Sequence, residues 1–125
     1  MDRGKVMAMT DEEMRKKCLR LCGWHSTTDQ STWSPTDGDP PHMYYEDTPD
    51  YPRCIYSAML LWDAWRGEHV RYFRLQYDPV SNIDMPWQCT FSRDAIGREL
   101  IHGQADAAPR AITRAFILAM TEGDK

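Results

Sequence analysis

The sequence predicts an α+β fold in which a small antiparallel β-sheet packs against helices, in the order helix, loop, helix, strand, strand, strand, helix. Apolar and polar residues alternate over 70–77 and again over 85–91, the pattern of strands with one buried face. Apolar residues recur at helical spacing over 10–22, 52–66 and 104–120, before and after these strands. Consecutive strands flanked by helices favour an antiparallel sheet with helices packed against it.

The length and composition indicate one globular domain. The chain has 125 residues, of which 42% are hydrophobic and 11% aromatic, enough for a buried core. We expect residues 1–9 to form a flexible N-terminal lead, residues 10–121 to form the single domain, and residues 122–125 to form a C-terminal tail.

The first helix is predicted to begin after Thr10, which can form a capping box with Glu13. Gly23 ends it, because glycine readily adopts the left-handed conformation that follows a helix. One side is apolar and the other basic, so we expect the first to be buried and the second to face water. The buried stripe comprises Met14, Cys18, Leu21 and Cys22, and the residues expected in water are Arg15, Lys16, Lys17 and Arg20.

The segment 25–51 contains several acidic residues and prolines but no lysine or arginine. A loop of this length is unusual in a compact domain and is more often functional or disordered. The rings of Trp33, Tyr44 and Tyr45 favour order, because disordered linkers contain few aromatic residues. We therefore expect an ordered excursion with one short strand near 43–45.

The helix predicted over 52–66 is apolar on two sides. One stripe comprises Ile55, Met59, Trp62 and Trp65, and the other side carries Leu60, Leu61 and Ala64. A helix of this kind is expected to be covered on both sides, and the sheet covers only one. The second cover is either another copy of the chain, which would make the protein a homo-oligomer, or the long acidic loop.

A third strand over 98–105 leads into the last helix. Asp106 is a candidate N-cap, and Pro109 is tolerated in the first turn, where a backbone N–H group has no helical partner. Small and apolar residues recur along this helix, namely Ala108, Ile112, Ala115, Phe116 and Ala119. They would allow the helix to lie close to the sheet, with Phe116 in the core.

Charge and cysteine usage exclude several classes of protein. A net charge of −4 argues against a binder of long nucleic acid, which needs a large basic surface. The four cysteines, Cys18, Cys22, Cys54 and Cys89, lie in apolar patterns and show no disulfide framework. No apolar run is long enough to span a membrane, and no secretory signal opens the chain. We expect a cytoplasmic protein without a membrane partner.

The sequence carries no recognisable catalytic motif. A Walker-type glycine loop, a G-x-S-x-G elbow and an H-E-x-x-H helix are all absent. Cys18, Cys22 and His25 resemble the start of a zinc site, but no second ligand pair completes it. We therefore expect a protein that is not an enzyme and that has no metal ion or cofactor.

Aromatic and arginine residues near the sheet and the last helix form the candidate ligand site. Flat rings can stack on a base, and arginines can hold phosphates. Arg110 and Arg114 lie one turn apart near a helix N-terminus, whose free N–H groups favour an anion. The candidate ligand-binding residues are Trp87, Phe91, Arg93, Arg98, Arg110 and Arg114. The alternative is that the rings belong to the core and the arginines are solvated surface charges.

Four short motifs of the chain match those of a known phage family. They are the helix end Leu21-Cys22-Gly23-Trp24, the Tyr51-Pro52 entry to a tryptophan-bearing helix, the strand with Trp87, Cys89 and Phe91, and above all the run ADAAPRAITRA from Ala105 to Ala115. Together they resemble the phage ABA sandwich domain over about residues 11–120. The resemblance implies an ABA-sandwich-like domain.

Within that family, the best-understood members that the chain resembles are the type-one Thoeris anti-defence proteins. The resemblance implies a phage sponge that sequesters glycocyclic ADP-ribose, and also cyclic trinucleotides of CBASS immunity, without cleaving them. It further implies a homo-oligomer, a dimer or hexamer, in the cytoplasm of the infected bacterial host. The alternative is a phage protein-interaction module whose surface is the acidic loop and the tryptophan-rich helix.

Overall fold

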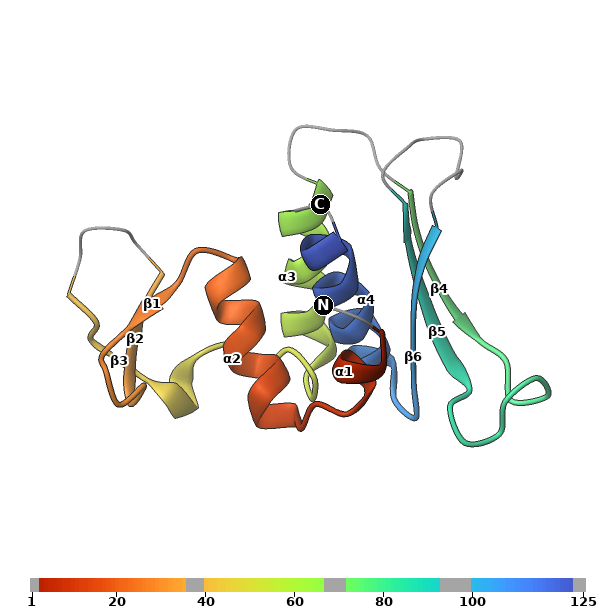
Figure 1. Cartoon of the computed structure of the whole chain (residues 1–125), viewed down its shortest axis with the longest axis horizontal. Helices are drawn as coiled ribbons and strands as arrows, with labels where there is room; N and C mark the ends of the chain where they lie inside the picture. Colours follow the sequence, from red (N-terminus) through yellow and green to blue (C-terminus); the bar gives the residue numbers. More distant parts are fainter. Residues whose placement is uncertain (1–2, 36–39, 67–71, 93–99, 123–125) are drawn as a thin grey trace.

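Helices lie between two small β-sheets in this protein (Figure 1). A computed structural model describes residues 3–35, 40–66, 72–92 and 100–122. The helices are α1 (Arg3–Met7), α2 (Asp11–Leu21), α3 (Ile55–Arg66) and α4 (Ala108–Glu122), with a 3₁₀ turn, η1 (Tyr45–Asp47). The strands are β1 (His25–Ser26), β2 (Thr32–Ser34), β3 (Met43–Tyr44), β4 (Tyr72–Tyr77), β5 (Trp87–Ser92) and β6 (Leu100–Ala105).

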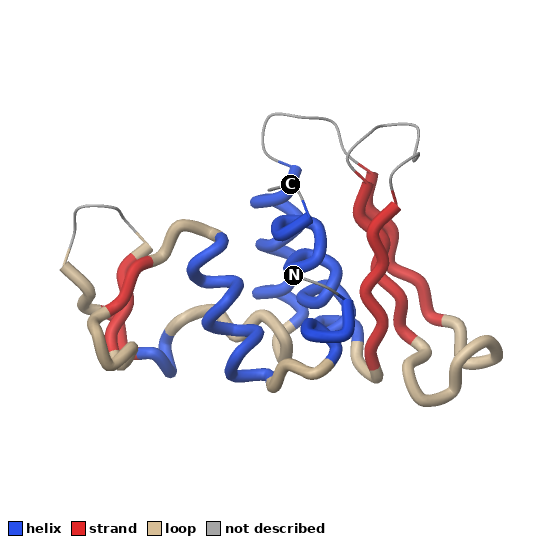
Figure 2. Tube along the Cα trace, in the orientation of Figure 1, coloured by secondary structure: helices blue, strands red, loops and turns tan. Residues whose placement is uncertain are grey.

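The predicted α+β class is confirmed. β4, β5 and β6 form one antiparallel sheet in that order, with α3 and α4 on one face of it. Figure 2 shows a second sheet at the other end of the molecule, beyond α2; it is the antiparallel sheet β1-β2-β3. The short strand expected near 43–45 is present as β3, and the sequence does not predict β1 or β2. Strands of two or three residues are too short to show an alternating pattern.

The main sheet and α4 approach each other closely at Gly103. A Cβ atom at this position would lie 2.5 Å from the carbonyl oxygen of Ala111 and 2.9 Å from the Cα of Ala115. Both neighbours are backbone atoms of α4, so only glycine allows the helix to lie at this distance from β6. The contact is made at Ala111 and at Ala115, and Ala115 is one of the small residues that the sequence predicts to lie close to the sheet.

α4 is the central helix of the domain. It contacts β5, β6, α2 and α3, and from Ala111 to Ala119 every residue is buried except Arg114. Phe116 is fully buried, as predicted. The hydroxyl of Thr113, which is also buried, donates a hydrogen bond to the carbonyl of Pro109 at 2.8 Å. Between residues 111 and 119, Arg114 is therefore the side chain that is partly exposed to solvent.

Both ends of α2 agree with the prediction. The Glu13 N–H donates to the Thr10 hydroxyl at 3.1 Å, and the Thr10 N–H donates to the Glu13 carboxylate at 3.3 Å, which completes the capping box. Gly23 follows the helix with a φ of 93°, a conformation that favours glycine. On the buried side, Leu19 is fully buried, whereas Leu21 and Cys22 are only partly buried.

Arg15, expected in water, is buried, so that prediction is wrong. Its side chain donates to the carbonyls of Tyr45 and Thr48 at 2.8 and 2.7 Å and to the Thr48 hydroxyl at 3.2 Å. Its guanidinium also lies 4.4 Å from the centre of the Tyr45 ring. Arg15 thus holds the η1 region against α2. Its partners lie 30 and 33 residues further along the chain, so no local pattern shows them.

Residues 3–7 form α1, where the sequence predicts part of a flexible lead. Val6 is fully buried, which packs this short helix onto the domain. Arg3 donates a hydrogen bond to the carbonyl of His102 in β6 at 3.0 Å. The buried side chain of Val6 and the hydrogen bonds of Arg3, which also donates to the Gln104 side chain at 3.3 Å, attach a segment that has no periodic pattern of its own.

Candidate functional site

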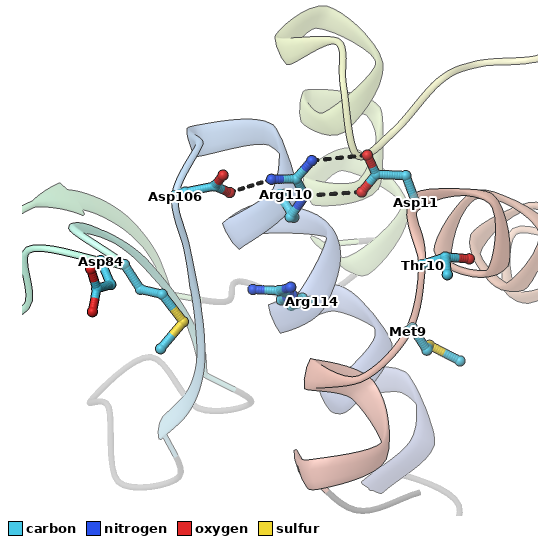
Figure 3. Close-up of a pocket in the computed structure, with 8 residues that line it drawn as sticks. Met9, Thr10, Asp11, Asp84, Asp106, Arg110 and Arg114 are labelled. Atoms are coloured by element: carbon cyan, nitrogen blue, oxygen red, sulfur yellow. Dashed lines mark hydrogen bonds and ion pairs between the residues drawn. The ribbon is translucent and has the colours of Figure 1, made fainter.

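A pocket of about 460 Å³ opens beside the first turns of α4 (Figure 3). Three parts of the chain line it: the entry to α2, the link between β4 and β5, and the start of α4. The lining residues are Met9, Thr10, Asp11, Asp84, Met85, Asp106, Arg110 and Arg114. Small-molecule sites commonly enclose about 300–1,000 Å³, so the pocket is large enough for one such ligand.

Arg110 is held by two carboxylates. Its Nε and Nη2 atoms donate to the two oxygens of Asp11 at 2.9 and 2.8 Å, and Nη1 pairs with Asp106. Figure 3 shows its guanidinium between them. The hydrogen bond from Arg110 is the main cause of a lowered pKa of Asp11, which also pairs with Arg53 at 3.3 Å. Arg110 therefore joins the starts of α2 and α4, and its charge is compensated.

Arg114 lies one turn further along α4 in different surroundings. Its Nη1 donates to the carbonyl of Gln104 at 2.7 Å, and its Nε is buried without a hydrogen-bond partner. Within the described residues its guanidinium forms no ion pair. Burial lowers the pKa of Arg114, and the nearby positive charge of Arg110 lowers it further. The charge of Arg114 is thus less compensated than that of Arg110.

Arg114 also contributes to the edge of the main sheet. β6 is an outer strand, and the carbonyl of Gln104 that accepts from Arg114 belongs to it. Arg3 donates in the same way to the carbonyl of His102, two residues earlier on the same strand. Covering such groups hinders another strand from pairing at an open edge. A mutational test of Arg114 as a ligand contact must therefore preserve its hydrogen bond to Gln104.

The backbone at the start of α4 provides further donors. The N–H group of Ala111 donates to the carbonyl of Ala107 at 3.0 Å, the first bond of the helical ladder. The N–H groups of Ala108 and Arg110 precede it and have no acceptor within α4, and Pro109 has no N–H group. This end of the helix dipole favours a negative charge. The helix N-terminus and Arg114 act in the same direction on an anion.

The pocket is not uniformly positive. Asp84, from the β4–β5 link, is exposed, and the side chain of Asp106 is 64% exposed. Ionised carboxylates only accept hydrogen bonds, so these two residues suit hydroxyl or amino groups of a ligand. The arrangement therefore fits a ligand that has both an anionic group for Arg114 and neutral donors for the aspartates.

Phe91 does not reach this pocket. Its side chain is fully buried, and its ring centre lies 6.0, 5.9 and 5.5 Å from those of Trp62, Trp65 and Phe73. The predicted stacking of Phe91 on a ligand is not supported, because a ligand could reach this ring only if the core opened. Phe91 lies on the side of β5 that faces the helices, and its ring therefore belongs to the aromatic core.

The remaining predicted site residues divide into two groups. Trp87 is partly buried, packs on Tyr77 with ring centres 4.9 Å apart, and is not part of the pocket lining. Arg93 and Arg98 lie outside the described residues. The pocket brings together the predicted pair Arg110 and Arg114.

The sequence did not indicate the acidic half of the pocket. Asp11 and its partner Arg110 are 99 residues apart, and no local pattern connects them. Asp106 was predicted only as a helix cap, although its spacing of four residues from Arg110 is that of an ion pair on a helix. Asp84 lies in a link whose course a sequence pattern does not determine.

In the described part of the chain, no group of three or more histidine, cysteine, aspartate or glutamate residues could hold a metal ion. Over the same residues, no helix combines the length and the apolar character needed to cross a bilayer.

Comparison with solved structures identifies a phage protein with a similar fold. No protein-family model and no curated protein matches the sequence. The fold is similar to that of a phage protein from Bacillus cereus, with a TM-score of 0.63 and 17% sequence identity, over 92% of this chain and 90% of that chain. At this identity the similarity shows a shared fold, so a function has to be argued from the site.

Proposed function

We propose that this chain is a phage anti-defence protein that binds a small nucleotide signal in the pocket at the start of α4 and holds it without cleaving it. The observation that carries the proposal is the guanidinium of Arg114, which lines the pocket and forms no ion pair among the described residues. The sequence resemblance to nucleotide sponges and the fold shared with a phage protein support the same conclusion.

The ligand binds with a phosphate toward Arg114 and the free N–H groups at the start of α4. A guanidinium and a helix N-terminus are both suited to phosphate oxygens. Arg110 keeps its bonds to Asp11 and fixes the position of the helix start. Ribose hydroxyls or a base amino group donate to Asp84 or Asp106, and Met9 and Met85 provide apolar contacts for the base.

This arrangement favours a nucleotide with few charges and several hydroxyl groups. A highly phosphorylated ligand would bring additional negative charge close to Asp84 and Asp106. Glycocyclic ADP-ribose, the signal implied by the sequence resemblance, has two phosphates together with ribose hydroxyls. A cyclic oligonucleotide is the second ligand class to test.

Calorimetric titration of glycocyclic ADP-ribose into an Arg114→Gln variant tests the proposal. Glutamine keeps an N–H donor on a shorter side chain and removes the positive charge, and circular dichroism checks that the fold is retained. A hydrogen bond to a charged group contributes about 1.5–3 kcal/mol, so the dissociation constant should rise roughly ten- to a hundredfold. Arg74→Gln is the matched control, because Arg74 is exposed on β4 and outside the pocket. The dissociation constant of this variant should equal that of the unmodified protein.

Release of the bound ligand distinguishes a sponge from an enzyme. The complex is heated, and the nucleotide set free is compared with the original by chromatography. Intact nucleotide agrees with sequestration, and an altered nucleotide means that the protein is a hydrolase. Equal affinity in a folded Arg114→Gln protein would place the site elsewhere.

A protein-interaction module is the second candidate. The observation in its favour is the apolar surface near the β4–β5 link, where Tyr77, Val80 and Ile83 are 57, 94 and 82% exposed. Isolated apolar groups are common on protein surfaces, but three on one hairpin form a plausible contact for another protein. The interaction module is favoured if neither nucleotide class binds. In that case the double variant Val80→Ser with Ile83→Ser should abolish capture of a defined host or phage protein.

A further inference from the structure

The two edges of the main sheet differ in what covers them. β4 and β6 are its outer strands (Figure 1). On β6, two arginine side chains donate hydrogen bonds to backbone carbonyls of the strand. On β4, no hydrogen bond from another element of the described part of the chain reaches the backbone on the side that faces away from β5. This side of β4 is called the open edge, and unpaired backbone groups at such an edge can pair with another strand.

The hydrogen-bond pattern of the sheet shows which backbone groups point to the open edge. The N–H of Asp78 donates to the carbonyl of Pro86 at 2.7 Å, and this pair continues the register of β4 with β5. In an antiparallel pair, residue pairs that are bonded to each other alternate with pairs that are not. Every second residue of β4 therefore bonds to β5, and the residues between them direct their N–H and C=O groups to the open edge. These residues are Phe73, Leu75 and Tyr77.

The contacts at β6 agree with this alternation. The even-numbered residues of β5 bond to β4, so its odd-numbered residues bond to the odd-numbered residues of β6, which lie opposite them. The carbonyls of His102 and Gln104 must then face outward, and they are the two carbonyls that accept from Arg3 and Arg114. By the same rule, the open edge of β4 presents three N–H donors and three carbonyl acceptors.

The side chains of β4 indicate what kind of strand fits the open edge. On the side that faces the helices, Phe73 packs on Trp62 with ring centres 4.8 Å apart, Phe73 and Leu75 are only partly buried, and Tyr77 is 57% exposed. On the other side, Arg74 is exposed and forms no ion pair among the described residues. A matching strand is therefore apolar toward the helices and carries a carboxylate on its other face, opposite Arg74.

We propose that the open edge of β4 binds an extended, acidic peptide segment of another protein, which adds to the main sheet as a fourth strand. The backbone of the segment bonds to Phe73, Leu75 and Tyr77, its apolar side chains cover the partly exposed rings, and its carboxylate pairs with Arg74. A second copy of β4 matches less well, because antiparallel pairing centred on Leu75 puts Gln76 of the partner subunit opposite Arg74 and leaves that charge unpaired. The proposal does not depend on the nucleotide pocket.

Amide hydrogen exchange of the unmodified full chain tests the state of the edge. The N–H groups of Phe73, Leu75 and Tyr77 should exchange at least tenfold faster than those of Arg74 and Gln76, because only the latter two bond to β5. Slow exchange at all five positions would mean that the chain itself or a second copy already covers the edge, and this would overturn the proposal.

A synthetic peptide tests the binding of an extended segment. In this probe, valine alternates with polar residues, and glutamate occupies the central polar position. Titration followed by NMR should give a dissociation constant on the order of 100 μM, and exchange at Phe73, Leu75 and Tyr77 should slow in the complex. The control peptide is methylated on the backbone nitrogens that would donate to β4. It keeps every side chain but loses these donors, so its dissociation constant should be at least tenfold higher.

A reversal of charge makes the test specific for Arg74. The unmodified protein should bind the glutamate peptide about two- to fivefold more tightly than a peptide with lysine at that position, the range of an exposed cross-strand ion pair. Arg74→Glu should reverse this preference, and circular dichroism checks that its fold is retained. Lys17→Glu, which makes the same change of charge on α2, should leave the preference unaltered. No binding of either peptide at about 1 mM, equal binding of the methylated peptide, or a preference that Arg74→Glu does not reverse would overturn the proposal.

Discussion

The two sheets of this molecule are attached to its helices by different interactions. The main sheet, β4-β5-β6, rests on α3 and α4 through apolar side chains and the close approach of Gly103 to α4. The smaller sheet, β1-β2-β3, has the fully buried Trp33, while the chain that follows β3 is held by hydrogen bonds from the buried guanidinium of Arg15. The first attachment is extensive and apolar, whereas the second combines the buried ring of Trp33 with the polar contacts of Arg15.

Because the two attachments differ, the two sheets should not lose their structure together. Parts of a protein with few buried apolar contacts open at lower free energy than the core does. We expect the main sheet to unfold only with the whole domain, whereas the smaller sheet can separate locally.

Truncation of the core beneath the main sheet should have the largest effect. Phe116→Ala removes a fully buried ring from α4, and such changes typically cost about 3–5 kcal/mol. The free energy of unfolding, measured by urea denaturation, should fall by this amount in one cooperative transition. Ile83→Ala, at an exposed position, should change it by less than about 0.5 kcal/mol. A small effect of Phe116→Ala would contradict the assignment of the core.

Removal of the buried cation should affect the smaller sheet selectively. Arg15→Met keeps much of the side-chain volume but removes the donor to the carbonyl of Thr48, whereas the carbonyl of Tyr45 still accepts from the hydroxyl and N–H of Thr48. An unsatisfied buried polar group costs about 1–3 kcal/mol, so amide hydrogen exchange of β2 and β3 should accelerate roughly ten- to a hundredfold. Exchange in β5 should change little.

Lys17→Met on the same helix is the control for Arg15→Met, because Lys17 forms no hydrogen bond or ion pair with the η1 region in the described part of the chain. If Arg15→Met accelerated exchange in both sheets equally, the two attachments would not be independent.

Acid should have the smallest effect, confined to the β1–β2 turn. Hydrogen bonds from Thr27 and Ser31 lower the pKa of Asp29 from 3.8 to about 2. Because the pKa is lower in the folded state, the ionised carboxylate stabilises the turn above about pH 4, and this contribution is lost as the pH falls toward about 2. The indole N–H signal of Trp33, which donates to the carbonyl of Gln30 at 2.9 Å, reports the change by NMR.

Asp29→Asn is the control for the acid titration. The asparagine variant has no charge to lose at this position, so its Trp33 signal should vary less over the same pH range. A Trp33 signal that titrates identically in both proteins would show that another group causes the change.

The same contrast explains what the sequence could predict. The capping box of Thr10, the left-handed Gly23 and the burial of Phe116 follow from local spacing, and the structure confirms each of them. The burial of Arg15 and the pairing of Arg110 with Asp11 depend on residues far along the chain. Local periodicity contains no information about such partners.

The candidate site shows the same division. Arg110 and Arg114 could be selected because a helix start and their spacing of one turn are local features. Phe91 is a residue type that can stack on a base. The sequence alone does not show which face of β5 packs against the helices, and this depends on how β5 pairs with its neighbours. Asp84 comes from a link whose path depends on the whole hairpin.

The close approach of α4 to β6 at Gly103 limits how the two elements can move relative to each other. A strand and a helix whose backbones are this close cannot shift along each other by a turn without a steric clash. The position of Arg114 along β6 is therefore fixed by the fold itself. A rigid guanidinium loses little conformational freedom on binding. A glycine in the sheet therefore helps to preorganise an arginine on the helix.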